Sequence, residues 1–436
     1  MSLVPRAARA LSTAAVLSLA LAGAWELGAD HAASAPQATH QVANPQAGWT
    51  DTWTAMQQLT EASNMPPAPF TQPDGVLKDT TLRTTLRVTA AGDRIRVAVS
   101  NEFGGAPLPV TKVAVARPAG GAAGVSGIEP GTSKQLTFSG HGSLTIPQGA
   151  RYLSDPLPFK VQAGENLTVT MYLADGQASQ SITSHPGSRT TTYLINGDHT
   201  DDATLPADTA HVDHWYFLSN VEVQAADTAT VVIGDSITDG RGSTTNGNDR
   251  WTDQLADRLQ AAHITNVSVL NEAAGGNRIL ADGLGPSVVS RIDRDIFSQA
   301  GASKVIVFEG VNDIGVADAT PQAQQQVTAD IITALDQMVT RAHAHGLRIY
   351  GATITPFGNN AGYDDTAGLR EQSREAVNHW IRTSGRFDAV IDFDKAVRDP
   401  EHPDQIQESL GVGDWLHFNP QGYAKIAAAV PLGLLR

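Results

Sequence analysis

The sequence predicts two folded regions of different classes: a β-sandwich of jelly-roll type, followed by an α/β domain whose parallel sheet carries helices on both faces. From Trp49 to about Val223, apolar residues alternate with period two in short runs, separated by turns rich in Gly, Pro and Asp. After Ala226, apolar runs alternate instead with stretches of helical period. A chain of 436 residues is also too long for one ordinary core. We therefore expect domains at residues 49–225 and 226–436.

The start of the chain is expected to precede both domains. Residues 1–35 are typical of a secretory signal peptide, because two arginines precede an uncharged apolar run and a small-residue cleavage site follows it. The site is Ala33–Ala35, with Ala22–Ala24 as the alternative. A membrane anchor is disfavoured, because the apolar run Ala10–Ala24 is shorter than the roughly 20 residues of a spanning helix. Residues 36–48 are predicted to be a flexible leader, so the protein is expected to be secreted.

The composition excludes several classes of function. The formal net charge is −15 at pH 7, whereas a nucleic-acid-binding protein needs a basic surface. The chain contains no cysteine, which rules out disulfides, a thiol nucleophile and thiolate metal ligands. Its stability must therefore come from packed cores.

The first domain shows the pattern of many short strands. Apolar and polar residues alternate over Thr81–Val88 and Asp93–Ser100, on either side of a turn at residues 90–93. Short strands at this spacing are typical of an antiparallel sandwich. The connector to the second domain, residues 224–228, is short, so we expect the two domains to be docked on each other. The further predicted strands are Val110–Val115, Ser143–Ile146, Leu167–Leu173 and Thr190–Ile195.

The second domain alternates five predicted strands with helices. Strand–helix alternation is typical of a parallel sheet covered on both faces. The predicted strands are Val231–Ile233, Val267–Leu270, Lys304–Phe308, Arg348–Ile354 and Ala389–Phe393.

The helices of this domain are predicted from their apolar stripes and their ends. Residues 250–259 place an apolar side chain at every fourth position. The clearest helix is expected over residues 322–345, with Gly346 in the C-cap position. The last helix is expected to begin with Asn419 as N-cap and Pro420 at its first position.

Four polar stretches of the second domain are expected to meet at one edge of the sheet. Three of them follow successive predicted strands, and parallel strands bring such loops to the carboxyl edge, where ligands bind in open α/β folds. The fourth lies just before the last helix. The stretches are Gly234–Thr238, Asn271–Asn277, Gly310–Asp313 and Asp414–His417.

These stretches contain the groups that a serine hydrolase needs. A serine hydroxyl becomes a nucleophile when a base takes its proton and a third group fixes the tautomer of the base. His417 can be the base for Ser236, and Asp414 can accept a hydrogen bond from Nδ1 of that histidine. The backbone N–H groups of Ser236 and Gly276 and the side-chain amide of Asn312 can stabilise an oxyanion. Taken alone, each stretch is more often part of a turn or a helix cap than of a catalytic site.

Together, the four stretches resemble the four sequence blocks of the SGNH (GDSL-type) hydrolases, over residues 231–436. The resemblance implies a flavodoxin-like, three-layer α/β/α domain. It also implies Ser236 as the nucleophile, with Asp414 and His417 completing a catalytic triad.

The same resemblance implies an oxyanion hole formed by Ser236, Gly276 and Asn312, without a cofactor or a metal. The neighbouring Gly275 is the alternative glycine donor. Ile237 stands where the family name has leucine, which is a minor departure. A β-rich domain before an SGNH domain is similar to an arrangement of secreted bacterial esterases.

Other residues near these stretches have competing interpretations. Asp235 and Asp239 flank the serine and are expected to accept backbone N–H bonds rather than to bind a metal. Asp392 and Asp394 are a less favoured alternative to Asp414 as the partner of the histidine.

Aromatic residues are candidates for the substrate pocket. Trp415, Phe357 and Tyr363 are expected either to line an acyl or alcohol pocket or to pack in the core. The polar loop at residues 359–365 follows the fourth strand and is a candidate for a segment that contacts substrate.

The predicted function is that of an exported serine esterase that hydrolyses short-chain acyl or acetyl esters, including those on carbohydrates, through an acyl-enzyme at Ser236. The alternatives are a lipase or phospholipase, an acyltransferase with the same triad, and a non-catalytic carbohydrate-binding protein. The expected partners are small-molecule, polysaccharide or lipid esters, and neither nucleic acid nor a stable membrane anchor is expected.

Overall fold

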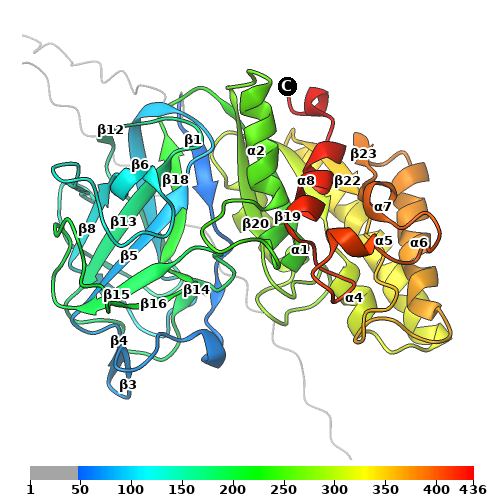
Figure 1. Ribbon diagram of the computed structural model, residues 1–436, viewed down its shortest axis with the longest axis horizontal. Helices are drawn as coiled ribbons and strands as arrows, with labels where there is room; N and C mark the ends of the chain where they lie inside the picture. The colour runs from blue at the N-terminus through cyan, green and yellow to red at the C-terminus, as the bar shows by residue number, and fades with distance from the viewer. Residues whose placement is uncertain (1–47) are drawn as a thin grey trace, which may run out of the picture. The chain divides into compact units, whose positions relative to one another are not determined.

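A computed structural model describes residues 48–436 of the chain. The predicted signal peptide (1–35), with its two cleavage sites, and residues 36–47 of the predicted leader lie outside the described residues. The described residues belong to one compact unit, in which antiparallel strands up to residue 223 precede an alternation of strands and helices (Figure 1). The boundary at residue 226 stays a prediction. Within the described part of the chain, no helix has the length and apolar character needed to cross a membrane.

Two antiparallel sheets form the β-rich region and share one apolar core. The first sheet has the order β1-β18-β6-β11, with β12 also paired to β6, and the second has the order β16-β15-β5-β13-β8-β9. Apolar side chains of both sheets, such as Val97 of β6 and Val169 of β13, belong to that core. The expected antiparallel, β-rich architecture is therefore observed, and the jelly-roll topology stays a prediction. The strands are β1 (Thr50–Thr54), β5 (Thr80–Arg87), β6 (Gly92–Ser100), β8 (Lys112–Ala116), β9 (Lys134–Gln135), β11 (Arg151–Leu153), β12 (Leu157–Val161), β13 (Asn166–Leu173), β15 (Thr192–Asn196), β16 (Ala210–Val212) and β18 (Leu218–Val223).

Short strands add three small sheets to this region. One joins β17, β14 and β2, and it lies next to the cavity described below. These strands are β2 (Gln58–Leu59), β3 (Thr71–Gln72), β4 (Gly75–Val76), β7 (Leu108–Val110), β10 (Leu144–Ile146), β14 (Thr183–His185) and β17 (Trp215–Tyr216).

Two details of the β-rich region differ from the sequence pattern. The turn at residues 90–93 joins strands of different sheets, since β5 pairs with β13 and β15 whereas β6 pairs with β18, β11 and β12. The alternation in β5 also does not mark a solvent-exposed face. Arg83 is fully buried there, because the carbonyl groups of Ser126 and His199, from covering loops, accept its hydrogen bonds. This burial lowers the pKa of Arg83 to about 10.

The five predicted strands of the α/β region are confirmed, with ends that differ by at most three residues. All pair in parallel, in the order β20-β19-β21-β22-β23. This is the order of flavodoxin-like folds, whose ligands bind at the carboxyl ends of the strands where the winding direction reverses. That point lies at the ends of β19 and its two neighbours. The strands are β19 (Thr228–Gly234), β20 (Val267–Ala273), β21 (Ala302–Phe308), β22 (Arg348–Ala352) and β23 (Ala389–Ile391).

The helices flank this sheet as the winding requires. The connection from β19 through α2 to β20 runs in one direction, and that from β21 through α5 to β22 runs in the other. Because both crossovers are right-handed, α2 and α5 lie on opposite faces. Helix α2 packs beside α8, and α5 packs beside α6 (Figure 1). The helices are α1 (Ser236–Asp239), α2 (Trp251–Ala261), α3 (Val288–Ile292), α4 (Val311–Val316), α5 (Pro321–Ala344), α6 (Leu369–Thr383), α7 (Phe393–Val397) and α8 (Pro420–Ala429).

The predicted helix ends are confirmed. Gly346 follows α5 with a φ of +72°, in the left-handed region that glycine adopts most easily. Asn419 caps α8, since its side chain accepts hydrogen bonds from the N–H groups of Gln421 and Gly422, and Pro420 is the first helical residue.

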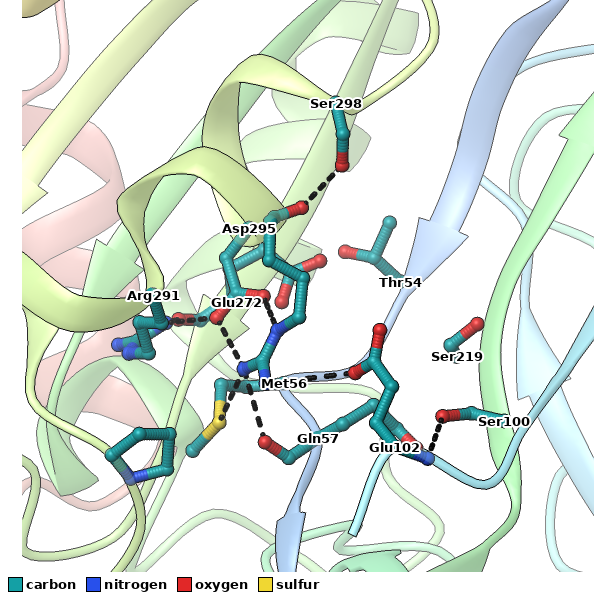
Figure 2. A network of polar contacts seen from close by, with 12 residues as sticks. Thr54, Met56, Gln57, Ser100, Glu102, Ser219, Glu272, Arg291, Asp295 and Ser298 are labelled. Carbon is teal, nitrogen blue, oxygen red and sulfur yellow. Dashed lines mark hydrogen bonds and ion pairs between the residues drawn. The ribbon is translucent and has the colours of Figure 1, made fainter. Parts of the chain in front are cut away.

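The β-rich and α/β regions are docked through polar contacts. Asp51 of β1 exchanges two hydrogen bonds with the backbone of Ala300, and its carbonyl accepts a third from Ser268 Oγ. A second contact is a charged network, in which Arg294 of the α/β region pairs with both Asp295 of its own region and Glu102 of the β-rich region. Figure 2 shows Glu102 and Asp295 in this network. The expectation of docked regions is therefore met.

Candidate active site

Ser236 is the first residue of the short helix α1, directly after β19. Asp235 caps this helix, since its carboxylate accepts a hydrogen bond from Ile237 N at 2.8 Å. A Cβ at Gly234 would lie 2.5 Å from Thr238 Oγ1 and 2.9 Å from the carbonyl oxygen of Phe308. Glycine at residue 234 thus permits the tight turn that places Ser236 at the carboxyl edge of the sheet.

A chain of hydrogen bonds links Ser236 to His417 and Asp414. The distance from Ser236 Oγ to His417 Nε2 is 2.7 Å, and that from His417 Nδ1 to Asp414 Oδ2 is 2.6 Å. The second carboxylate oxygen of Asp414 accepts from the N–H groups of Leu416 and His417. With Nδ1–H donating to the carboxylate, Nε2 of the imidazole is free to accept the proton of the serine hydroxyl.

The electrostatic surroundings favour a neutral imidazole and an ionised carboxylate. Burial lowers the pKa of His417, and the hydrogen bond and charge of Asp414 oppose this shift only in part. Burial also raises the pKa of Asp414, but hydrogen bonds from the backbone and imidazole of His417 outweigh it and hold the pKa below its usual range. At neutral pH, Nε2 of His417 can therefore take up the proton of the Ser236 hydroxyl.

Donor groups converge on the same place from two neighbouring loops. Gly276 adopts a φ of +69° in the loop after β20, in the left-handed region. Asn312 lies in α4, where its Nδ2 donates to the carbonyl of Asn277 at 2.8 Å and its Oδ1 accepts from the hydroxyl of Tyr363 at 2.7 Å. These two bonds fix the amide and leave one N–H of Asn312 available for a ligand.

One cavity of about 750 Å³ contains these predicted site residues. Ser236, Gly276, Asn312, Asp414 and His417 all line it, so the structure brings together the residues that the sequence singled out. Gly275 lines the same cavity, so the choice of Gly276 as the donor stays a prediction.

The β-rich region forms part of the cavity wall, which the sequence did not predict. No motif marks these residues, because they reach the cavity only through the docking of the two regions. They are Gln58, Glu61, Ser63, Asn64, His185, Pro186, Gly187, Arg189 and His214.

The alternative roles of four aspartates can now be compared with their contacts. Asp235 accepts a backbone N–H bond as expected. For Asp239 the expectation was wrong, because its buried Oδ1 is 2.9 Å from Nε2 of His185, a residue of the β-rich region. Asp392 and Asp394 pair with Arg382, and Asp394 also with Arg374, so neither replaces Asp414 beside the histidine. Among residues 48–436, no cluster of three or more His, Asp or Glu side chains is arranged to hold a metal ion.

The aromatic candidates divide between the cavity and the core. Tyr363 lines the cavity and holds Asn312, whereas Phe357 is buried in the apolar core and Trp415 packs against it. The polar loop at residues 359–365 does reach the site, since Asn360 also lines the cavity and donates to the carbonyl of Asp414 at 2.7 Å.

Comparison with known proteins gives a family for the second half of the chain. The GDSL-like lipase/acylhydrolase family matches residues 232–425. This chain carries a GDSL hydrolase domain. The matched residues include Ser236, Gly276, Asn312, Asp414 and His417, whereas the β-rich region lies outside the match.

Several solved structures are similar to part of this chain. A putative lipolytic protein of the G-D-S-L family from Desulfitobacterium hafniense has 20% identity and a TM-score of 0.35, with 47% of this chain and 97% of that chain covered. A lipase/acylhydrolase from Enterococcus faecalis has 17% identity and a TM-score of 0.35, with 46% and 92% covered. A variant of an acetyl xylan esterase from Geobacillus stearothermophilus has 19% identity and a TM-score of 0.36, with 46% and 92% covered. The search of curated proteins produced no match.

Proposed function

We propose that the protein is a secreted serine esterase that hydrolyses carboxylic esters through an acyl-enzyme at Ser236. The observation that carries this proposal is the hydrogen-bonded chain from Ser236 Oγ through His417 to Asp414, with distances of 2.7 and 2.6 Å. Secretion rests on the predicted signal peptide at residues 1–35.

The first half-reaction forms the acyl-enzyme. His417 Nε2 takes the hydroxyl proton while Ser236 Oγ attacks the ester carbonyl carbon, which gives a tetrahedral oxyanion. Asp414 stabilises the imidazolium that results. The protonated Nε2 then gives its proton to the alcohol oxygen as the carbon–oxygen bond breaks, and the alcohol leaves.

The second half-reaction releases the acid. Water attacks the acyl carbon, its proton passes to His417 Nε2, and the collapse of the second tetrahedral intermediate returns that proton to Ser236 Oγ. In both halves the negative charge develops near the N–H groups of Ser236 and Gly276 and the free N–H of Asn312. Donors of this kind act only once the charge has formed, so they lower the barrier rather than tighten substrate binding.

The cavity favours a polar alcohol portion in the substrate. Around the serine, Gln58, Glu61, Asn64 and His214 supply hydrogen-bonding groups, whereas the apolar lining includes Leu284 and Leu416. A sugar that carries a short acyl or acetyl group fits such a wall better than a long lipid chain does. The β-rich region is accordingly assigned a role in substrate binding in addition to its packing against the GDSL domain.

Replacement of the nucleophile tests the proposal. Ser236→Ala removes Oγ and should abolish the hydrolysis of 4-nitrophenyl acetate, while the melting temperature stays close to that of the wild type. As a matched control, Ser243→Ala removes a hydroxyl from the following loop that bonds only the carbonyl of Gly240. That variant should retain activity. Full activity of Ser236→Ala would refute the proposal.

A further inference from the structure

Two arginines line the cavity without any partner for their charge. Arg189 comes from the segment after β14 in the β-rich region, and Arg241 comes from the loop that follows α1. Within residues 48–435, every other arginine side chain donates at least one hydrogen bond to a protein group, whereas no such bond or ion pair forms at these two. An unpaired guanidinium in the cavity that holds Ser236 is available to an anionic ligand.

Arg189 is held in an unusual backbone conformation. Its φ is +51°, in the left-handed region, which costs a non-glycine residue about 1–2 kcal/mol. The conformation is fixed by Asn246, whose N–H donates to the carbonyl of Arg189 at 2.8 Å, and by Ser188 Oγ, which accepts from Thr190 N and donates to its carbonyl. Arg250 also donates to the carbonyl of Ser188. The segment is therefore built to present this side chain.

The side chain of Arg189 also contains a buried donor that lacks an acceptor. Its Nε has almost no solvent-accessible surface and makes no hydrogen bond within the described part of the chain. A buried unsatisfied donor costs about 1–3 kcal/mol, more when the group is charged. The protein itself therefore leaves part of the Arg189 guanidinium without an acceptor.

Among the described residues, no acidic group of the cavity forms an ion pair with Arg189 or Arg241. Asp239 pairs with His185, Asp414 pairs with His417, and the two carboxylate oxygens of Glu61 accept from the side-chain amides of Gln58 and Asn64. After burial, which is the main cause, the charges of Arg241 and Arg189 further lower the pKa of His417. Both guanidinium groups therefore lie within electrostatic reach of the reacting centre.

We propose that Arg189 and Arg241 form an anion subsite, and that the natural ester carries a carboxylate close to the acyl group, as an acylated sugar acid does. Guanidinium groups bind carboxylates by paired N–H···O bonds that an ammonium cannot reproduce. The chain as a whole has a net charge of −15, so the attraction is local to this cavity. This subsite rests on the proposed esterase function and specifies its substrate class.

A pair of isosteric substrates tests the subsite. One is the mono-acetyl ester of methyl glucuronoside, and the other is the same ester with its carboxylate converted to a carboxamide. The kcat/KM for acetate release should be at least about tenfold higher for the carboxylate, because each charge-assisted hydrogen bond contributes roughly a factor of ten. The preference should fall with added salt, which screens the charges.

Substitutions assign the preference to the two residues. Arg189→Gln and Arg241→Gln should each reduce the carboxylate-to-carboxamide ratio about tenfold, and Arg189→Lys should restore only part of it. Arg94→Gln changes an exposed arginine of the β-rich region outside the cavity and should keep the wild-type ratio. A wild-type ratio near one, or variants that lose both substrates equally, would overturn the subsite while the esterase stands.

A binding measurement separates this proposal from the esterase function. Calorimetry of Ser236→Ala with glucuronate and with glucuronamide needs no turnover. Tighter binding of glucuronate, weakened about tenfold by Arg189→Gln in the same background, supports the subsite even if the wild type hydrolyses no ester. Equal binding of the two sugars refutes it.

Discussion

Arg294 is the residue that links the β-rich region most directly to the GDSL domain. It lies in a short π-helical turn (Asp293–Phe297) and donates to the carbonyl of Gln57 at 3.0 Å. It also pairs with Asp295 of its own turn and, at 3.5 Å, with Glu102 of the β-rich region, and its guanidinium lies over the ring of Phe103. Arg294→Met keeps the length of the side chain and removes every polar contact of the guanidinium.

The size of the expected loss of stability follows from the groups that Arg294→Met leaves without a partner. Asp295 keeps a partner, because Arg291 Nη1 remains 2.8 Å from its Oδ2. Glu102 keeps only Arg151 at 4.0 Å, and burial already raises its pKa despite the charge of Arg294. Breaking a buried pair by removing one partner costs about 3–5 kcal/mol. Because one of the two acids stays paired, we expect a loss near 3 kcal/mol, or a fall of about 4 °C in the melting temperature of a unit of this size.

Thermal unfolding monitored by circular dichroism measures this loss. Arg386→Met is the matched control, since Arg386 pairs with Asp336 on the surface, where such pairs contribute about 0–1 kcal/mol. Adding Glu102→Gln to Arg294→Met should recover part of the stability, because it removes the charge left unpaired. A loss no larger than that of the control, or no recovery in the double variant, would refute the buried network as a source of stability.

Three further predictions concern the site. The acidic limb of the pH profile of kcat/KM should have its midpoint below pH 6.5, because burial lowers the pKa of His417 and the neutral imidazole is the base. A midpoint above pH 6.5 would contradict this. Asn312→Ala should reduce kcat by about 10²–10³-fold with a smaller change in KM, as expected for an oxyanion donor. Steady-state kinetics would measure both constants, and a change confined to KM would contradict this role. Glu309→Gln should leave the free energy of unfolding unchanged below about pH 4.5. Above that pH, the variant should become progressively more stable than the wild type, by up to about 1.4 kcal/mol per pH unit. Denaturant unfolding at a series of pH values would measure this difference.

The sign of the Glu309 effect follows from its surroundings. This carboxyl is buried, neither of its oxygens has a partner in the described structure, and it faces Asp235 and Asp313. Burial and then these two acids raise its pKa well above 4.5. The folded state therefore keeps a proton that the unfolded chain has lost, so stability falls as pH rises through that window. Glutamine resembles the protonated acid and has no such penalty. An equal pH dependence in the two proteins would contradict this reasoning.

The fold of the second half could be predicted because local signals were sufficient. Each parallel strand is a short apolar run that ends at a glycine or polar loop, and helix ends such as Asn419 and Gly346 have their own chemistry. The β-rich region was predicted less well. The turn at residues 90–93 resembles a hairpin turn, but it crosses between sheets, and Arg83 looks like a surface residue until the loops that cover it are placed.

The residues of the candidate site also differ in how well the sequence predicts them. Asp414 and His417 are three residues apart, so their contact is nearly local, and Ser236, Gly276 and Asn312 meet because of sheet topology alone. Arg189 could not be found from the sequence. Its place in the cavity of Ser236 depends on how the β-rich region docks, which is decided by long-range contacts that leave no periodic pattern.

The central claim is that Ser236 is the nucleophile, and covalent labelling tests it most directly. The mature protein treated with a fluorophosphonate should gain one label, which peptide mass spectrometry should place on Ser236, with hydrolysis of 4-nitrophenyl acetate lost in proportion to labelling. His417→Ala should label far more slowly, because the hydroxyl then lacks its base. Loss of activity with the label on another residue, or an unlabelled Ser236 in an active protein, would contradict the claim.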